Sequence, residues 1–443
     1  MKKVRLGSGA GYSGDRIDPA VELARFGNLD YLVFECLAER TIALAQQSKR
    51  SGVSEGYDPL LVDRMNAVLP HCVSNGVKII SNMGAANPIA AATKTQETAQ
   101  ALGLTGLRIA AILGDDVLDH MPGSNTFMEN GEPVASVAGR LVSANAYLGA
   151  GPIIEALAAG ADIVLTGRAA DPSLFLAPLI HEFGWDPSDW NLLGQGTAVG
   201  HLLECAGQLT GGYFADPGYK DVPGLAHLGF PLAEVSSDGK AILTKVEGSG
   251  GCLTQATCIE QLLYEIQDPA SYITPDVIAD FSQVQFADLG HDRVRVSGAT
   301  GKPRPEMLKV SVGFHDGWIG EGQISYAGPG AVARAQLAEQ ILAERLQSAR
   351  LSELRFDLIG MNSIHGGRLS PKSCEPWEVR LRTIARAGAR EHAAIAPREV
   401  EALYTNGPAG GGGVSTSVRE TIAILSTLIP ADLPRPSIHI EVS

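Results

Sequence analysis

Short apolar stretches rich in β-branched residues alternate with helix-length segments over the first half of the chain. Four such stretches, at 31–35, 77–81, 107–113 and 162–166, are each followed by a loop rich in Gly, Asn, Asp, Glu and Arg. Near-continuous apolar strands separated by helical segments predict a parallel sheet covered by helices on both faces. Because such sheets bind ligands at the carboxyl ends of their strands, we expect the functional residues on these loops.

A break in this periodicity predicts a domain boundary. Three prolines and three glycines lie between 216 and 231, a composition typical of a connector. A chain of 443 residues also exceeds what one hydrophobic core usually supports. We therefore expect an α/β protein with a Rossmann-like, mostly parallel-sheet domain over 1–220, an α+β domain over 232–443 and a site in the cleft between them.

The second half has a mixed pattern. It predicts strands near 293–297, 307–314, 321–326 and 356–360, helices over 331–346 and 389–403, a glycine-rich loop at 406–413, a helix from there to about Leu428, and a terminal strand at 438–442. The strands resemble an antiparallel set, which is why an α+β domain is expected.

Composition and charge narrow the class of protein. The net charge of −14 and the isoelectric point near 5.2 argue against a nucleic-acid-binding protein, which needs a basic face. No run of about 18 apolar residues is present, so we expect no membrane span. The six cysteines are scattered without a CxxC pair, which indicates reduced thiols and a cytoplasmic protein. We further expect a homo-oligomer.

The first glycine-rich loop fits a nucleotide-binding pattern. Gly9, Gly11 and Gly14 match G-x-G-x-x-G, and Glu35 ends the next strand about 20 residues later, as in dinucleotide-binding domains. The following helix begins late, however, at Asp18. Three interpretations stay open here: a dinucleotide site, a loop for another anion or substrate, and a tight turn.

The second glycine-rich loop is also a candidate for binding an anion. Gly410, Gly411 and Gly412 precede Ser415, which can cap a helix whose free backbone N–H groups bind phosphate or carboxylate. The loop lacks the Gly-Lys-Ser/Thr ending of a P-loop. The alternative is a flexible hinge.

A cluster of acidic residues follows the third strand. Asp115 and Asp116, with Asp119 and His120 close behind, offer oxygen ligands for Mg²⁺ or another hard cation. The alternative is a charged loop that caps a helix.

The remaining candidates are catalytic. Arg168 can clamp a carboxylate or phosphate, or it can form an ion pair with Asp171 that ties its own loop. Glu35 is a candidate general base if burial raises its pKa. Asn82 and Asn87 can orient a carbonyl or contact an oxyanion, although Asn is equally suited to turns.

Of the two histidines that lie near predicted strand ends in the second half, His365 is the better acid–base candidate. The alternative is that this histidine is structural. The chain has no Gly-x-Ser-x-Gly motif, and no cysteine has the sequence context of a nucleophile. Covalent catalysis is therefore unsupported.

Five stretches in order resemble the acyclic terpene utilisation AtuA family, at 7–16, 32–41, 81–88, 166–172 and 406–413. The resemblance spans nearly the whole chain. It implies a component of catabolic clusters that handle branched acyl-CoA intermediates. Some members carry an extra carboxyl-terminal ferredoxin-like domain that we expect to be missing here, so a small ferredoxin-like partner protein is also expected.

These observations predict a catabolic enzyme with lyase, hydratase or isomerase chemistry on a small carboxylate or acyl-CoA. In this hypothesis Arg168 and the glycine loops bind the anionic groups, Asn82 and Asn87 polarise a carbonyl, and Glu35 or Asp171 moves a proton. A CoA thioester is then the substrate. An NAD(P)-dependent oxidoreductase, an enzyme with a divalent metal, and a non-catalytic subunit that supports a partner enzyme remain as alternatives.

Overall fold

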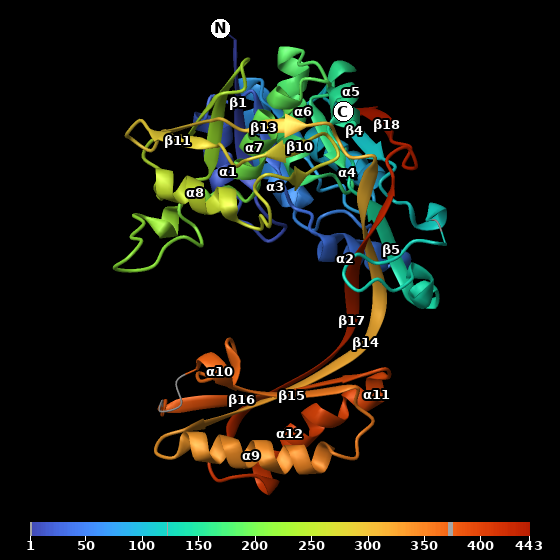
Figure 1. Cartoon of the computed structure of the whole chain (residues 1–443), viewed down its shortest axis with the longest axis vertical. Helices are drawn as coiled ribbons and strands as arrows, with labels where there is room; N and C mark the ends of the chain where they lie inside the picture. Colours follow the sequence, from blue (N-terminus) through green and yellow to red (C-terminus); the bar gives the residue numbers. More distant parts are fainter. Residues whose placement is uncertain (1, 122, 371–374) are drawn as a thin grey trace. The chain divides into compact units, whose positions relative to one another are not determined.

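The computed structural model describes residues 2–121, 123–370 and 375–443. The chain forms two compact units (Figure 1). The first unit comprises Met1–Gly313 and Ile424–Ser443, and the second comprises Phe314–Ala423. The structure thus divides the chain at other points than the segment 216–231. That segment lies within the first unit because the strand after it, β7 (Pro231–Ser236), pairs with β1 (Lys3–Ala10).

The first unit is built on a ten-stranded sheet with the order β11-β12-β8-β7-β1-β2-β3-β6-β4-β18. Its centre, from β1 to β4, is parallel, and antiparallel strands flank it on both sides. The further strands are β2 (Tyr31–Phe34), β3 (Lys78–Ser81), β4 (Arg108–Leu113), β6 (Ile163–Thr166), β8 (Ala241–Lys245), β11 (Gln285–Asp288), β12 (Val294–Ser297) and β18 (Ser437–Val442).

The α/β class and the parallel sheet are confirmed, but a Rossmann-like arrangement is not. The parallel strands have the order β1-β2-β3-β6-β4. They follow the order of the sequence except that β6 lies between β3 and β4. A Rossmann sheet instead reverses at its centre to give two mononucleotide-binding halves. All four predicted strand ends nevertheless lie at the same edge of the sheet, because parallel neighbours share their direction.

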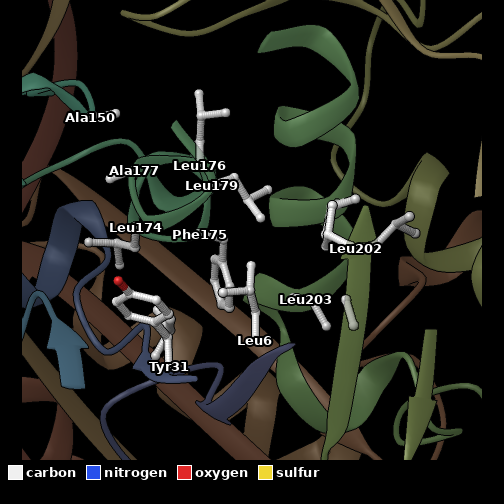
Figure 2. Packing of buried hydrophobic residues seen from close by; sticks show 14 of the residues in the cluster. Leu6, Tyr31, Ala150, Leu174, Phe175, Leu176, Ala177, Leu179, Leu202 and Leu203 are labelled. Carbon is white, nitrogen blue, oxygen red and sulfur yellow. The ribbon is translucent and has the colours of Figure 1, made fainter. Parts of the chain in front are cut away.

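Helices cover both faces of this sheet. The helices of the first unit are α1 (Asp18–Phe26), α2 (Glu39–Arg50), α3 (Leu61–Asn75), α4 (Pro88–Ala101), α5 (Gly151–Ala158), α6 (Asp171–Phe183), α7 (Trp190–Glu204) and α8 (Gln255–Leu263). One hydrophobic cluster joins the sheet to α1, α3 and α4, and another joins its opposite face to α5, α6 and α7. Figure 2 shows part of the second cluster, where Leu6 and Tyr31 of the sheet lie near Phe175 of α6 and Leu203 of α7.

Three short strands form a small separate sheet in the first unit, with the order β13-β10-β9. They are β9 (Tyr272–Ile273), β10 (Ile278–Asp280) and β13 (Thr300–Lys302). The strand β5 (Leu141–Ala146) pairs with β14 (Met307–Ala327), which continues into the second unit. Single 3₁₀ turns occur at Leu118–His120, Val134–Arg140, Ala206–Gln208 and Leu225–His227.

The second unit has the element sequence β-α-β-β-α-β. Its elements are β14, α9 (Ala331–Leu346), β15 (Glu353–Ile359), β16 (Glu378–Ala387), α12 (Ile395–Asn406) and β17 (Gly412–Pro430), with short helices α10 (Gly366–Leu369) and α11 (Arg390–Ala393). The strand order β15-β16-β14-β17 is that of a ferredoxin-like fold. α9 and α12 pack with the sheet in one buried cluster.

One predicted element of this unit is wrong. We expected a helix after the second glycine loop, but the structure has the strand β17 there. β-Branched residues recur through the segment, among them Val414, Thr416 and Val418, and such residues favour strands. The two predicted strands at 307–314 and 321–326 are one continuous strand, β14.

In the part of the chain that the structure describes, no helix combines the length and the apolar character needed to cross a membrane.

Candidate functional site

Loops at the carboxyl ends of β2 and β3 are joined through one amide. The Nδ2 of Asn82 donates to Oε1 of Glu35 at 2.9 Å, and the Oδ1 of Asn82 accepts from the backbone N–H of Cys36 at 2.7 Å. Both ends of the Asn82 side chain are therefore engaged in holding the β2 loop and its carboxyl group. Asn82 positions Glu35 and is itself fully buried.

The loops after β4 and β6 join the same cluster. The backbone N–H of Arg168 donates to Oδ2 of Asp115 at 2.8 Å, and the buried guanidinium of Arg168 donates to the carbonyl of Leu37 in the β2 loop. Asn145 donates to the same oxygen of Asp115 at 2.8 Å. The approach is so close that a Cβ on Gly167 would lie 2.4 Å from an Asp115 oxygen. The four strand ends thus meet around Arg168.

The charge of Arg168 is balanced from several sides. Its Nη1 lies 3.0 Å from Oδ1 of Asp171, whose side chain is 31% exposed. The guanidinium carbon lies 4.2 Å from the ring centre of Tyr147, a cation–π contact. The guanidinium therefore forms the predicted ion pair with Asp171, and Asp171 remains the more accessible partner.

A cavity of about 220 Å³ opens beside this ion pair within the first unit. One part of its wall is polar and carries both signs of charge. Its charged and titratable side chains are Glu39, Tyr147, Arg168, Asp171, His201, Glu204, Glu265 and Lys309. The other part is apolar, with Pro172, Tyr272, Ile273, Pro275, Pro305, Met307 and Leu308.

A histidine–glutamate pair on α7 lies at the cavity. Nδ1 of His201 lies 2.7 Å from Oε1 of Glu204, and Nε2 of His201 lies 3.2 Å from the carbonyl oxygen of Leu262. A carbonyl only accepts hydrogen bonds, so Nε2 carries a proton. Nδ1 and Oε1 then share one further proton, either as imidazolium with carboxylate or as neutral imidazole with carboxylic acid.

The surroundings of the pair bring the pKa of Glu204 close to neutral pH and raise the pKa of His201. Burial raises the pKa of Glu204 to about 7, against the opposing effect of His201, and the nearby Asp171 raises it further. Burial acts to lower the pKa of His201, but the Glu204 carboxylate outweighs it and the pKa is raised. The second oxygen of Glu204, Oε2, has no hydrogen-bond partner among the described residues.

Two more carboxyl groups have raised pKa values. Burial, together with repulsion from Asp171, raises the pKa of Glu35 to about 8, although Arg168 and Asn82 oppose the shift. Burial raises the pKa of Asp115 to about 6, against its hydrogen bonds from Arg168 and Asn145. Glu35 is not among the residues that line the cavity.

Glu39 differs from these carboxyl groups because its pKa is lowered and not raised. Burial alone would raise its pKa, but Arg168 and a hydrogen bond from Tyr147 lower it to about 2. Nζ of Lys309 lies 3.2 Å from Oε1 of Glu39 and 4.9 Å from the ring centre of Tyr147. Lys309 is 42% exposed, which makes it the more accessible of the two cations in the cavity wall.

Neither Asn87 nor His365, two of the predicted catalytic residues, is among the residues that line the cavity. Asn87 caps α4 by accepting from the N–H of Ala90 at 3.3 Å, and it donates to the carbonyl of Glu55 at 2.9 Å. This is the turn-forming role given above as its alternative. His365 is exposed in the second unit, at the start of α10.

The first glycine loop is closely packed. A Cβ on Gly9, which lies within β1, would approach the Phe34 ring to 2.6 Å, and one on Gly11 would approach the backbone of Cys205 to 2.6 Å. A Cβ on Gly14 would meet the ring of Tyr12. The glycines therefore allow a strand and a turn to pack tightly.

A buried arginine holds the same turn from within. Arg64 donates to the carbonyl of Ser13 at 2.7 Å and pairs with Asp58 at 3.1 Å. The carbonyl groups of the turn are thus directed at a protein cation.

The second glycine loop belongs to the second unit. Gly410, Gly411 and Gly412 lead into β17, and Ser415 is an exposed strand residue. The predicted helix N-terminus at Ser415 is therefore wrong, because the strand leaves no set of parallel free N–H groups.

Asp115 and Asp116 are engaged by protein donors. Oδ2 of Asp116 accepts from Gln46 at 3.1 Å and its Oδ1 accepts from the N–H of Leu118 at 3.2 Å. Across residues 2–121, 123–370 and 375–443, no group of three or more His, Cys, Asp or Glu side chains is arranged to hold a metal ion. Both carboxylates therefore accept hydrogen bonds from donors of the protein itself.

Sequence analysis did not identify several residues of the cavity wall, among them Tyr147, His201, Glu204 and Lys309. The spacing of His201 and Glu204, three residues apart in an otherwise apolar helix, was a usable signal, since such residues share one helix face. Tyr147 directly follows β5 and Lys309 lies in β14, far away along the chain, and neither carries a local signal.

Comparison with known proteins gives one match. The model of a family described as "Acyclic terpene utilisation family protein AtuA" matches residues 4–440. No curated protein and no solved structure matches the chain.

Proposed function

Since this chain belongs to the acyclic terpene utilisation family AtuA, which implies a role in the catabolism of such compounds, we propose that it transfers protons on a branched unsaturated carboxylate or acyl-CoA. The reaction takes place in the cavity of the first unit. Lyase, hydratase and isomerase reactions of such substrates share one step, the movement of a proton next to a carbonyl group.

The observation that carries the proposal is the His201–Glu204 pair. A general acid–base works best when its pKa is near the working pH, and Glu204, at about 7, exists in both forms there. Its Oε2 is buried and has no protein partner among the described residues, so a substrate in the cavity supplies the partner that this oxygen lacks and exchanges a proton with it. His201 balances the resulting charge through its hydrogen bond to Oε1.

The other wall residues supply binding. Lys309 is placed to contact the carboxylate or thioester oxygen of the substrate, and Glu39 and Tyr147 hold its ammonium group. Asp171, beside Arg168, is a second group able to move a proton. Ile273, Met307 and Leu308 provide an apolar surface for a branched hydrocarbon chain.

Deuterium exchange tests this proposal whichever product the reaction forms. The full chain is incubated in D₂O with a panel of branched unsaturated acyl-CoA thioesters and the free acids, and mass spectrometry records deuterium uptake and new masses. We expect uptake with at least one of these compounds. Glu204→Gln should slow it by roughly 10²- to 10⁴-fold, the usual contribution of a general acid–base.

The control is Glu155→Gln, which changes an exposed glutamate on α5 and should leave the rate unchanged. No uptake and no new mass with any compound, or full activity in Glu204→Gln, would contradict the proposal.

A further inference from the structure

A second cavity of about 180 Å³ lies against the first. The two share Leu308 and Pro275 as lining residues, so these two residues form the wall between them. The rest of the second cavity is mainly apolar, with Leu148, Pro152, Ala431 and Pro434 among its residues. All of these belong to the first unit.

We infer that the second cavity, here called the tail chamber, binds the far end of the hydrocarbon chain of the substrate, and that Leu308 at its entrance limits which chains enter. This inference rests on the proposed function. It assigns a substrate class, an extended branched hydrocarbon attached to a carboxylate or thioester, and names a residue that determines specificity.

The polar groups of the tail chamber do not point to a charged ligand. The carboxylate of Asp276 accepts from the backbone N–H of Ala150 at 2.8 Å and from the hydroxyl of Ser173, so it is already satisfied by the protein. Arg304 is exposed. Prolines 152, 275, 434 and 436 line the remainder, and their fixed φ angles give a wall that changes shape little.

Size supports the use of both cavities by one ligand. Pockets for small organic ligands usually measure roughly 300–1,000 Å³. Neither cavity alone reaches this range, but the two joined together do. The junction is also near the proposed binding group, because Leu308 and Lys309 both line the first cavity. A head group on Lys309 therefore leaves the chain beside the shared wall.

Two variants block the tail chamber from different sides. Leu308→Phe enlarges the buried side chain of the shared wall, and Ala431→Phe fills the chamber from an exposed position that does not touch the first cavity. Ala431→Ser is the matched control, since it changes the same position with little added volume. Thermal unfolding of each variant confirms that it folds.

Binding is measured by calorimetry with a series of acyl-CoA thioesters of increasing chain length. Wild type should gain affinity with each added methylene until both cavities are filled. Both Phe variants should stop gaining at a shorter chain and lose about fourfold in affinity per methylene excluded. For the shortest thioesters, Ala431→Phe and Ala431→Ser should match wild type.

The outcomes separate the two proposals. If wild type binds the series and Ala431→Phe binds the long chains equally well, the tail chamber is not used and only the present inference is overturned. The corresponding free acids are measured in the same way, and if wild type binds neither a thioester nor a free acid of any length, the proposed function fails, and the inference fails with it.

Discussion

At the residue scale, the site is a set of buried ionisable groups whose charges depend on one another. Sequence reasoning found Glu35, Arg168 and Asp171 because each follows a buried strand, and parallel strands end at one edge. It did not find His201 or Glu204, because their role arises from α7 packing against that edge. Residues at the end of a buried strand can be predicted from the sequence to lie at the site. Residues that a helix contributes cannot, because their position depends on tertiary packing.

Glu35 should make stability depend on pH. Its pKa in the folded protein, about 8, lies above the ordinary value of 4.5, so the folded state holds a proton that the unfolded state releases. The stabilisation is fully present below pH 4.5 and is lost as pH rises through 8. Glu35→Gln keeps an oxygen that can accept from Asn82 and removes this titration.

Urea unfolding of wild type and Glu35→Gln at pH 6 and pH 9 checks this prediction. The free energy of unfolding should fall more steeply in wild type, by about 1.4 kcal/mol for each pH unit between pH 6 and the folded pKa of Glu35. Equal losses in the two proteins would show that Glu35 is already ionised at pH 6.

The hydroxyl group and the ring of Tyr147 should each contribute to the free energy of unfolding. Tyr147→Phe removes the hydrogen bond to Glu39 but leaves the ring beside the Arg168 guanidinium. Hydrogen bonds to charged groups contribute roughly 1.5–3 kcal/mol, so we expect a loss of that order in the free energy of unfolding. Tyr147→Leu, which also removes the cation–π contact, should lose more, and an equal loss would argue against a role for the ring.

At the scale of elements, the first half of the chain was predictable because its apolar strands and helices alternate clearly. The predicted helix at 331–346 coincides with α9. The segment after the second glycine loop was misinterpreted as a helix, since Ser415 and Thr416 after a glycine run look like a helix cap. The β-branched residues that follow were the better signal, and β17 forms there.

We expect Gly167 to be essential for the close approach of the loops that follow β4 and β6. A Cβ at this position would lie 2.4 Å from the Asp115 carboxylate, which is itself held by the backbone of Arg168. Gly167→Ala should therefore push the two loops apart and cost about 1–3 kcal/mol, as in other overpacked sites. Gly139→Ala, where a Cβ meets nothing within 4 Å, is the control, and equal stability of the two variants in urea would contradict the prediction.

At the scale of the whole molecule, the chain combines a parallel-sheet unit that contains the cavity with a ferredoxin-like unit formed by a continuous segment, 314–423. The sequence predicted two kinds of architecture but put the division at a proline- and glycine-rich segment. Such composition marks a loop, yet β7 and β8 extend the first sheet beyond it. The two units are instead linked through the long strands β14 and β17, each of which runs from one unit into the other.

Because each of the two units has its own hydrophobic core, we expect the two units to unfold independently. Leu381 is fully buried in the cluster of the second unit, and Leu165 is fully buried in the first sheet. Leu381→Ala should cost about 2–5 kcal/mol in the unit that contains it. In hydrogen-exchange mass spectrometry of the full chain, peptides of β15, β16 and α9 should then lose protection, while those of β2 and β3 keep theirs, because local opening follows cooperative units.

Leu165→Ala should give the reverse pattern. The comparison of the two variants distinguishes two cooperative units from one, because a single unit would lose protection throughout in both. Loss of protection in β2 and β3 on substitution of Leu381 would therefore contradict independent unfolding. The expected pattern would also mean that the cavity with His201 and Glu204 keeps its geometry when the ferredoxin-like unit opens, since every residue of its wall lies in the first unit.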